Sequence, residues 1–355
     1  MDIKMIKATN FKAKPTEEKT LGFGKTFSDY MFIMEYTVKD GWHDARIQPY
    51  QPLTIDPASP VLHYGQEIFE GLKAYRRVDG KIGMFRPEEN AARMNRSAER
   101  MCMPQIPVDM QVQAMKALVD VEREWVPHSD GTSLYLRPTM IADGSTLGVH
   151  AAPRYIYFII CAPSGAYYAN GLAPVRIYIE DGYVRAVEGG TGEAKCGGNY
   201  AASMKGALVA EEKGYDQVLW LDGRQNRYIE EVGAMNVMFV IGGKLVTPKL
   251  HGSILPGITR KSILEVGRDM GLVVEERPID VQELVEAYKA GTMTEAFGTG
   301  TAAVISPIGE MAYKDTIMKF GDGKTIGPVS QKMYDTLTGI QWGRVADSHN
   351  WTCTL

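Results

Sequence analysis

The segment 189–200 is the feature that most constrains this chain, because its sequence, Gly-Gly-Thr-Gly-Glu-Ala-Lys-Cys-Gly-Gly-Asn-Tyr, is dominated by glycine. Glycine lets a backbone turn sharply and approach other groups closely. A single lysine, Lys195, sits among these small residues just before a predicted helix. Burial lowers the pKa of a lysine and leaves a free amine that can form a Schiff base with a carbonyl. A solvated surface loop would explain the same residues, so both interpretations stay open.

Size and composition indicate a globular protein of two domains. The 355 residues exceed what one hydrophobic core usually supports. Hydrophobic residues make up 45% of the chain and charged residues 23%, as in ordinary soluble proteins. The formal net charge of -4 argues against a nucleic-acid binder and against a protein that binds acidic membranes.

The sequence shows no pattern typical of secretion, membrane insertion or metal binding. Residues 1–7 lack the apolar stretch of a signal peptide, and no later apolar run is long enough to span a bilayer. The cysteines lack the close pairs of zinc or redox motifs, and the histidines are far apart. We therefore expect a cytoplasmic protein with reduced cysteines and no metal. The four cysteines are Cys102, Cys161, Cys196 and Cys353.

Hydrophobic periodicity and turn residues predict strands and helices along the whole chain. In the first half we predict strands at 29–39, 132–141 and 155–161, a hairpin of 69–78 with 82–85, and helices over Pro87–Arg100 and from an N-cap at Asp109 to about Trp125. In the second half we predict strands at 174–179, 217–221, 235–241 and 273–277, and helices at 200–213, 257–270, 281–290 and 329–345. Gly214, Gly271 and Gly291 are expected to end three of these helices.

A stretch of small residues and turn formers at 162–171, Ala-Pro-Ser-Gly-Ala-Tyr-Tyr-Ala-Asn-Gly, predicts the domain boundary. We predict an N-terminal α/β domain over 1–163, a linker over 164–174, and a C-terminal domain over 175–355 that carries Lys195. The fold class is α+β with mixed sheets.

Two common nucleotide motifs fail in this sequence. The fragments 24–26 and 323–325 end like P-loops, but Lys19 and Met318 stand where the first glycine is needed. The glycines at 190–192 lack the third glycine of a dinucleotide fingerprint, because Lys195 occupies its place. A nicotinamide-dependent oxidoreductase therefore loses most of its support.

Three other features offer better chemistry for an anion. The turn at 255–257 precedes a predicted helix, so the amides of Ile258 and Thr259 would face a ligand. The run 298–303 offers two hydroxyls and close backbone approach, and Arg93 offers a bidentate phosphate contact. A plain helix start, a bulged strand and a solvated helix face are the respective alternatives.

A reactive lysine together with anion-binding turns favours a phosphorylated aldehyde cofactor, of which pyridoxal phosphate is the common one. Its pyridine nitrogen needs a carboxylate nearby, so that the ring stays protonated and accepts electrons. Glu231 is the candidate, because small residues and a buried-looking strand follow it. A polar turn that enters this strand is the alternative.

Seven stretches occur in one order from about Phe27 to Gln341 and together resemble a known family. They are Tyr64–Tyr75, Phe85–Pro87 with Asn90–Met94, Tyr135–Pro138, Lys195–Tyr200, Glu231–Asn236, Leu255–Arg260 and Phe297–Ala302. The set closely resembles branched-chain amino acid aminotransferases, which belong to the fold-type IV class of pyridoxal phosphate enzymes. The resemblance implies an N-terminal α/β sandwich domain and a larger C-terminal β-pseudobarrel domain with helices.

The resemblance also implies roles for single residues. Lys195 would bind the cofactor as a Schiff base and carry the proton between the substrate α-carbon and the cofactor. Glu231 would bind the pyridine nitrogen and Tyr200 the phenolic oxygen. The phosphate would be held by Arg93, the amides of Ile258 and Thr259, and Thr299, and the substrate carboxylate by turn amides at Thr301 and Ala302.

In the same family pattern an apolar cage surrounds the substrate side chain, formed by Phe27, Tyr64, Phe69, Tyr135, Val149, Tyr167 and Ala234. Arg137 and the tyrosine hydroxyls would meet the γ-carboxylate of glutamate at the rim of this cage.

The chain departs from the mammalian pattern at Ala303 and Ser306, which replace a redox-sensing Cys-x-x-Cys, so we expect no thiol control. Ala234 replaces a threonine of some relatives, and Cys196 is predicted to be a packing residue.

These observations lead us to expect a homodimeric transaminase that moves the amino group of L-leucine, L-isoleucine or L-valine to 2-oxoglutarate, in a ping-pong reaction through pyridoxamine phosphate. In the family, a loop of the partner subunit closes the substrate side. A D-amino acid transaminase and an aminodeoxychorismate lyase share the fold and remain alternatives. A binding protein that retains the fold without catalysis is the alternative from another class.

Overall fold

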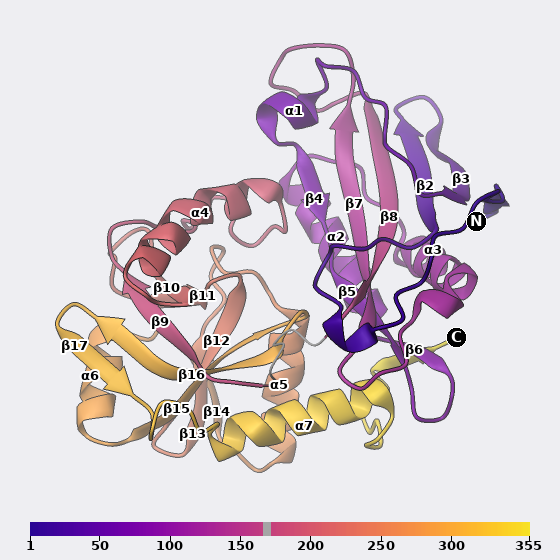
Figure 1. Ribbon diagram of the computed structural model, residues 1–355. Coiled ribbons are helices and arrows are strands. Elements are labelled where there is room, and N and C mark those ends of the chain that lie inside the picture. The colour runs from indigo at the N-terminus through magenta and orange to yellow at the C-terminus, as the bar shows by residue number, and fades with distance from the viewer. Residues whose placement is uncertain (166–171) are drawn as a thin grey trace. The chain divides into compact units, whose positions relative to one another are not determined.

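The computed structural model describes residues 1–165 and 172–355, apart from the side chain of Lys19 (Figure 1). The chain forms two compact units. The first contains Met1–Ala169, Ala194–Gly197 and Ile340–Leu355, and the second contains Asn170–Glu193 and Gly198–Gly339. Lys195 therefore packs with the first unit, although the chain up to Glu193 and the chain from Gly198 belong to the second. Tyr167 and the middle of the predicted linker lie outside the described residues.

The first unit is built on a nine-stranded sheet that is antiparallel except where β1 pairs with β3. Its order is β1 (Lys4–Met5), β3 (Gly41–Pro49), β2 (Tyr30–Thr37), β8 (Arg154–Ser164), β7 (Ser133–Asp143), β5 (Leu72–Arg76), β6 (Ile82–Phe85) and β18 (Thr352–Thr354), and β4 (Glu67–Phe69) also pairs with β7. The predicted hairpin is confirmed by the antiparallel pairing of β5 with β6.

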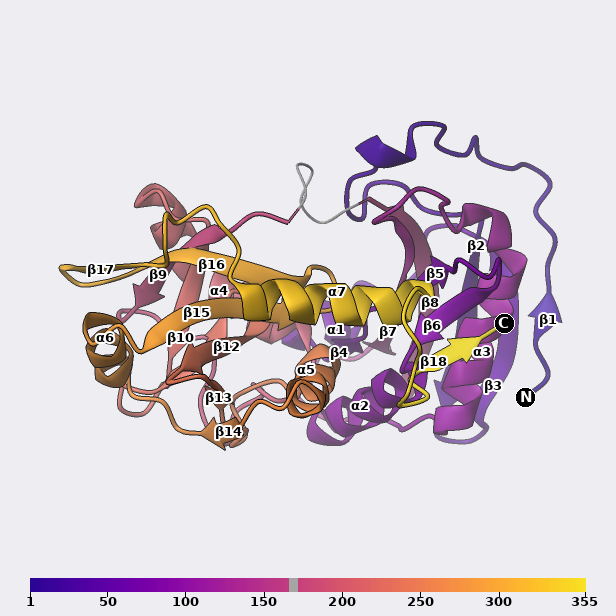
Figure 2. The same cartoon turned by 90° about the horizontal axis from the view of Figure 1, so that it is seen from below.

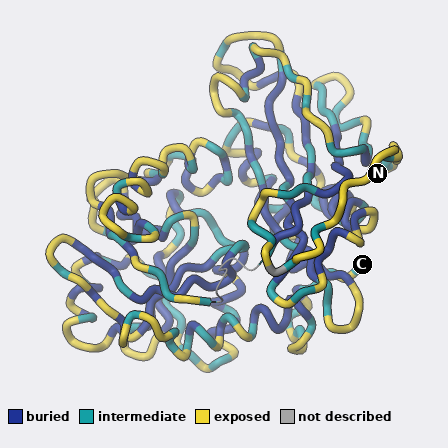
Figure 3. The backbone as a smooth tube through the Cα atoms, viewed as in Figure 1, coloured by how far each residue is buried: buried dark blue, intermediate teal, exposed yellow. Residues whose placement is uncertain are grey.

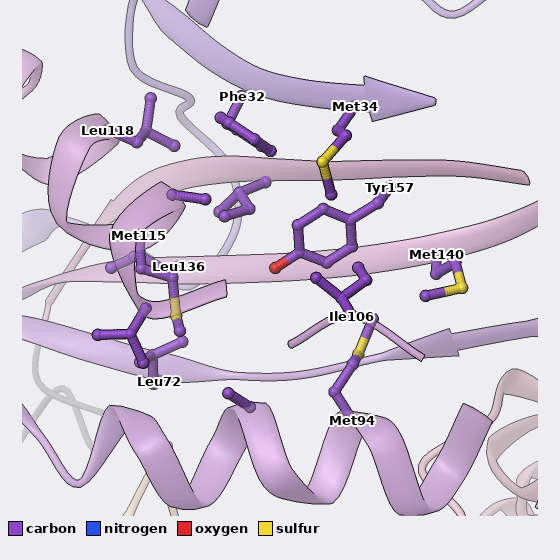
Figure 4. Close-up of a cluster of buried hydrophobic side chains, with 14 of the residues drawn as sticks. Phe32, Met34, Leu72, Met94, Ile106, Met115, Leu118, Leu136, Met140 and Tyr157 are labelled. Atoms are coloured by element: carbon purple, nitrogen blue, oxygen red, sulfur yellow. The ribbon is translucent and has the colours of Figure 1, made fainter. Parts of the chain in front are cut away.

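Two helices of the first unit, α2 (Pro87–Arg100) and α3 (Val108–Val121), lie side by side and pack against the sheet (Figure 2). The helix predicted from Pro87 is confirmed, and proline suits its first position because that N–H needs no partner. Met94 of α2 and Phe32 and Tyr157 of the sheet are fully buried members of one hydrophobic cluster (Figure 4). The spacing of apolar residues on α2 is thus explained by this core.

The N-cap predicted at Asp109 is wrong. Pro107 is the N-cap, with extended backbone and no side-chain capping bond, so the helix starts at Val108 directly after the proline. Asp109 falls inside the first turn, where a carboxylate still interacts favourably with the helix dipole. The helix ends at Val121, and a short 3-10 turn, η2 (Arg123–Trp125), follows it.

The second unit contains a closed barrel, which confirms the predicted α+β fold with a C-terminal β-pseudobarrel. Six strands close the ring because β12 pairs with β15 on one side and with β11 on the other. The ring runs through β11 (Ile229–Val232), β10 (Gln217–Leu221), β9 (Val175–Glu180), β16 (Val304–Tyr313), β15 (Met293–Gly300) and β12 (Met235–Ile241). The sheet is extended by β13 (Lys244–Pro248), β14 (Val274–Arg277) and β17 (Thr316–Lys319). The strands are largely buried (Figure 3).

The remaining helices are α1 (Pro60–Tyr64), η1 (Glu18–Thr20), α4 (Gly197–Glu212), α5 (Ile258–Asp269), α6 (Val281–Lys289) and α7 (Pro328–Trp342). The predicted helix ends at Gly214, Gly271 and Gly291 are confirmed, since these glycines have φ values of 80°, 76° and 67°. No helix in residues 1–165 or 172–355 combines the length and apolarity needed to cross a membrane.

Candidate active site

The segment around Lys195 is held in place by elements of the first unit. The Lys195 N–H donates to Ser97 Oγ on α2 at 2.9 Å, and the Lys195 carbonyl accepts from the Phe69 N–H at 2.9 Å. Ala194 and Cys196 are each 2% exposed and belong to the hydrophobic core. The segment is therefore not a solvated loop, and the prediction that Cys196 is a packing residue is confirmed.

The amine of Lys195 lies in buried surroundings, although the residue as a whole is partly exposed. Burial lowers its pKa to about 8, with a further lowering by Arg93 and an opposing effect of Glu70. At neutral pH this raises the free-amine fraction roughly 300-fold over a solvated lysine. Burial lowers the pKa of Lys73 on β5 to about 8 as well, so a low pKa alone does not distinguish Lys195. The position of its Nζ, 4.9 Å from the centre of the Phe69 ring, places Lys195 beside a predicted substrate residue.

Arg93 is 3% exposed, so it does not lie on a solvated helix face. Its Nε and Nη2 donate to the two carboxylate oxygens of Glu70, both at 2.8 Å, and Asn90 donates to the same carboxylate. Burial raises the pKa of Glu70, but Arg93, together with Lys195 and Asn90, lowers it by more, so the net pKa is lowered. Glu70 is therefore ionised and fixes the orientation of the guanidinium. Sequence reasoning missed Glu70, although it lies inside a matching stretch.

Phe69, Tyr135 and Arg137 come together as predicted substrate residues. The Arg137 guanidinium lies 4.6 Å from the Phe69 ring centre and 5.2 Å from that of Tyr135, and its Nη2 donates to the Tyr135 hydroxyl at 2.9 Å. Gly71 makes room for this arrangement, because a Cβ there would lie 2.1 Å from the Tyr135 hydroxyl oxygen. The cluster offers a cation and two aromatic faces close to Lys195.

The other predicted cage residues of the first unit lie elsewhere in it. Phe27 stacks on Tyr50 at 5.2 Å between ring centres. Tyr64, at the end of α1, is 43% exposed, and Val149, in the loop between β7 and β8, is 87% exposed. Tyr167 lies outside the described residues. Within the described chain, Tyr64 and Val149 are therefore not enclosed.

In the second unit Glu231 lies on strand β11, not in a polar turn, and is 3% exposed. Its Oε1 accepts from the Leu255 N–H at 2.7 Å, and its Oε2 pairs with Arg185 Nε at 3.3 Å. Asn236 Nδ2 donates to the Leu255 carbonyl at 2.9 Å. The matching stretch 231–236 thus anchors the loop that leads into α5. Arg185 was missed because nothing local in its sequence marks an ion pair.

The start of α5 offers backbone donors, as predicted. Gly257 is the N-cap without a side-chain capping bond, and Ile258 and Thr259 follow as the first helical residues. A Cβ on Gly257 would lie 2.0 Å from Asn236 Oδ1, so glycine is required there. Thr299 lies on β15, 1% exposed, and its hydroxyl donates to the Val304 carbonyl at 3.0 Å.

The run 298–303 combines the end of a strand with a turn. Gly298, Thr299 and Gly300 pair with β16, and Thr301 and Ala302 form the turn between these strands. Val304, just after the turn, has φ of 62°, a strained value for a β-branched residue that is typical of functional sites.

Tyr200 is half-buried near the start of α4, and Ala234 is exposed in the turn between β11 and β12.

In the described ranges, no three potential metal-ligating His, Cys, Asp or Glu side chains gather into one group. Glu70 in the first unit and Glu231 in the second are each paired with an arginine of the same unit.

The chain belongs to the class IV amino-transferases, whose family model matches residues 67–311. It is similar to branched-chain-amino-acid aminotransferase 2 of Bacillus subtilis (strain 168), with 51% identity over 347 residues that cover 98% of this chain and 95% of the relative. The solved branched-chain amino acid aminotransferase of Escherichia coli is 28% identical, with a TM-score of 0.73 over 91% of this chain and 98% of that one. The T.th. branched-chain amino acid aminotransferase complexed with N-(5'-phosphopyridoxyl)-L-glutamate is 26% identical, with a TM-score of 0.73 over 91% and 97%. The predicted family is thereby confirmed.

Proposed function

We propose that this chain is a pyridoxal 5'-phosphate-dependent branched-chain amino acid transaminase. It transfers the amino group of L-leucine, L-isoleucine or L-valine to 2-oxoglutarate and forms L-glutamate and the branched-chain 2-oxo acid in two ping-pong half-reactions. The 51% identity with a Bacillus subtilis branched-chain enzyme supports this reaction. Within the structure, the buried amine of Lys195 beside Phe69, with its pKa lowered to about 8, carries the proposal.

The residues present fit the cofactor. Buried Arg93 is a cation suited to a phosphate, and the uncapped start of α5 offers amides of the kind that bind phosphate. When bound, the cofactor supplies a carbonyl that accepts an amine and a ring that accepts electrons from the substrate α-carbon. We assign the phosphate to Arg93, the amides of Ile258 and Thr259, and Thr299, the pyridine nitrogen to Glu231, and the phenolic oxygen to Tyr200.

Lys195 has two tasks in this proposal. Its Nζ holds the cofactor between turnovers, because an amine with a pKa of about 8 is substantially uncharged under mild alkaline conditions. During turnover the same Nζ takes the proton from the substrate α-carbon and returns it on the cofactor side. The bonds of the Lys195 backbone to Ser97 and Phe69 keep the amine in position for both tasks.

The substrate site must accept both an apolar side chain and a carboxylate. Phe69 and Tyr135 offer apolar faces, and Arg137 between them offers a cation for the γ-carboxylate of glutamate. The glutamate adduct in the T.th. relative supports an acidic substrate. We assign to the cage Phe27, Tyr64, Phe69, Tyr135, Val149, Tyr167 and Ala234, and to the substrate carboxylate the amides of Thr301 and Ala302.

We further propose a cytoplasmic homodimer. The loop between β7 and β8 exposes Leu147 at 68% and Val149 at 87%, which is unusual for apolar side chains that lie so close together. In a dimer, this loop would cover the substrate side of the partner. The exposed position of Tyr64 supports the same conclusion.

Steady-state assays with 2-oxoglutarate test the proposed function. We expect L-leucine, L-isoleucine and L-valine to be turned over, and D-alanine to be at least about a hundredfold poorer, because a site that binds the α-carboxylate and the side chain as proposed would present the α-hydrogen of one enantiomer to Lys195. Turnover of D-alanine without turnover of L-leucine would contradict the proposal and favour a D-amino acid transaminase. Release of pyruvate from aminodeoxychorismate would instead favour the lyase.

A further inference from the structure

Glu67 is a carboxylate next to the substrate cluster to which no role has so far been given. It lies on β4 two residues before Phe69, so both side chains leave the same face of the strand. The N–H of Gly197, the first residue of α4, hydrogen-bonds the Glu67 carboxylate. The contact is close, since a Cβ on Gly197 would lie 1.8 Å from Glu67 Oε1. Glu67 is thus fixed against the packed segment, two residues beyond Lys195.

Arg137 acts on this carboxylate without forming an ion pair with it. Burial raises the pKa of Glu67, and Arg137 and the Gly197 amide lower it only in part, so the net pKa is raised. In the described residues Arg137 has no ion-pair partner, its Nη2 is bound to the Tyr135 hydroxyl, and its buried Nε has no acceptor. The guanidinium is therefore not neutralised by a carboxylate contact, unlike Arg93, which Glu70 neutralises directly.

We infer that Glu67 is a specificity-determining residue whose carboxylate competes with the γ-carboxylate of glutamate or 2-oxoglutarate for Arg137. This inference rests on the proposed role of Arg137. An ionised Glu67 attracts the guanidinium and repels an incoming dicarboxylate, whereas leucine carries no side-chain charge and is unaffected. Glu67 thereby shifts the preference of one pocket toward apolar side chains.

Position 67 can be altered without losing its structural contact. In Glu67→Gln the amide oxygen still accepts from the Gly197 N–H, so the start of α4 keeps its bond while the charge is removed. Glu88→Gln, an exposed residue in the first turn of α2, is the matched control for the same change in net charge. Arg137→Met tests the underlying role of the cation.

The experiment measures kcat/KM for L-glutamate with 4-methyl-2-oxopentanoate as the acceptor, and for L-leucine with 2-oxoglutarate as the acceptor. Binding of two unreactive acids, glutarate and 4-methylpentanoate, is measured by calorimetry on the same holoenzymes. We expect Glu67→Gln to raise the glutamate-to-leucine ratio and the affinity for glutarate about tenfold, the size of one charge interaction in a partly buried site. Leucine turnover and 4-methylpentanoate binding should change less than about twofold, and Glu88→Gln should change neither ratio.

The pH dependence provides a second readout. Protonation of Glu67 removes its charge, so the wild-type ratio should rise as the pH falls, and it should be flat in Glu67→Gln. Among the described residues, the other charged groups near this site are Arg137 of β7, which stays charged, and Lys195 with the Arg93–Glu70 pair, which act on both substrates alike. A parallel change for both substrates, or identical pH profiles, would overturn the inference.

The Arg137→Met variant shows whether a negative result refutes only the inference on Glu67 or also the proposed role of Arg137. If Arg137 meets the γ-carboxylate, this variant loses glutamate activity and keeps leucine activity, and the gain from Glu67→Gln falls below about twofold in the double variant. If Arg137→Met keeps glutamate activity, the proposed role of Arg137 is wrong. If Arg137→Met behaves as expected and Glu67→Gln leaves the ratio unchanged, only the inference on Glu67 is wrong.

Discussion

Two buried carboxylates, Glu70 in the first unit and Glu230 in the second, are both 1% exposed, but their pKa values are shifted in opposite directions. Both oxygens of Glu70 are held by Arg93, and the net pKa of Glu70 is lowered. Glu230 accepts a bond from Ser253, its Oε2 has no hydrogen-bond partner in the described residues, and burial raises its pKa to about 7. Solvent exposure is thus the same for the two carboxylates, and their neighbours differ: a bidentate cation stabilises the charged form of Glu70, whereas the nearby Glu231 and Asp222 disfavour that of Glu230.

The difference matters for the active site. Because Glu70 is ionised, it keeps Arg93 oriented beside Lys195. Arg93 lowers the pKa of Lys195, and Glu70 raises it. Glu230 precedes Glu231 on β11, and Arg185, which pairs with Glu231, lowers the pKa of Glu230 only in part. The first unit therefore carries a permanent ion pair, and the second carries a carboxyl group that changes charge near neutral pH.

The larger effect is expected from breaking the ion pair of the first unit. Glu70→Gln leaves the buried Arg93 without its bidentate carboxylate, and we expect the free energy of unfolding to fall by about 3–5 kcal/mol. Urea denaturation measures this loss. Glu99→Gln, an exposed change on the helix that carries Arg93, should stay within about 0.5 kcal/mol of the wild type. A loss of similar size in both variants would show that the ion pair of Glu70 with Arg93 does not stabilise the fold more than an exposed glutamate does.

A smaller and pH-dependent effect is expected at Glu230. Its pKa is about 7 in the folded protein and about 4.5 in the unfolded chain, so the protonated group stabilises the fold below pH 4.5 and this contribution is lost as the pH rises through 7. Glu230→Gln removes the titration. Relative to the wild type, its free energy of unfolding should therefore improve by about 2–3 kcal/mol between pH 5 and pH 8.

Denaturation of Glu230→Gln and wild type at both pH values measures this shift. The exposed Glu211→Gln on α4 is the matched control and should show no pH-dependent difference. If the difference between Glu230→Gln and wild type were the same at pH 5 and pH 8, the comparison between the two carboxylates would fail.

The sequence predicted elements best where local rules act alone. Pro87 at a first helical position and apolar residues at helical spacing predicted α2 with both ends correct. Strands β15 and β16 were not predicted as such, because 298–303 resembles a loop in sequence. Residues 298–300 become the end of β15 only through pairing with β12 and β16, and 301–303 form the turn. The start of α4 at Gly197 was missed for a similar reason, since its N–H is satisfied by Glu67, which is distant in sequence.

The site residues also divide into those that local sequence predicts and those that depend on contacts distant in sequence. Lys195, Arg137 and the start of α5 follow from residue chemistry or from the family resemblance, because each belongs to a short continuous stretch. The partners Glu70 and Arg185 do not, because an ion pair such as Glu70 with Arg93 is formed by the fold and leaves no local pattern. Lys73 shows the converse, since it has the same pKa of about 8 as Lys195 and lies in a matching stretch, yet no site role is assigned to it.

The central claim, that Lys195 holds the cofactor, is tested most directly by borohydride reduction of the holoenzyme followed by peptide mass mapping. Reduction fixes the cofactor to the amine that carries it. We expect the added mass on the peptide that contains Lys195, none on the peptide with Lys73, and no label in Lys195→Ala. Label on Lys73, or unchanged labelling of Lys195→Ala, would contradict the account.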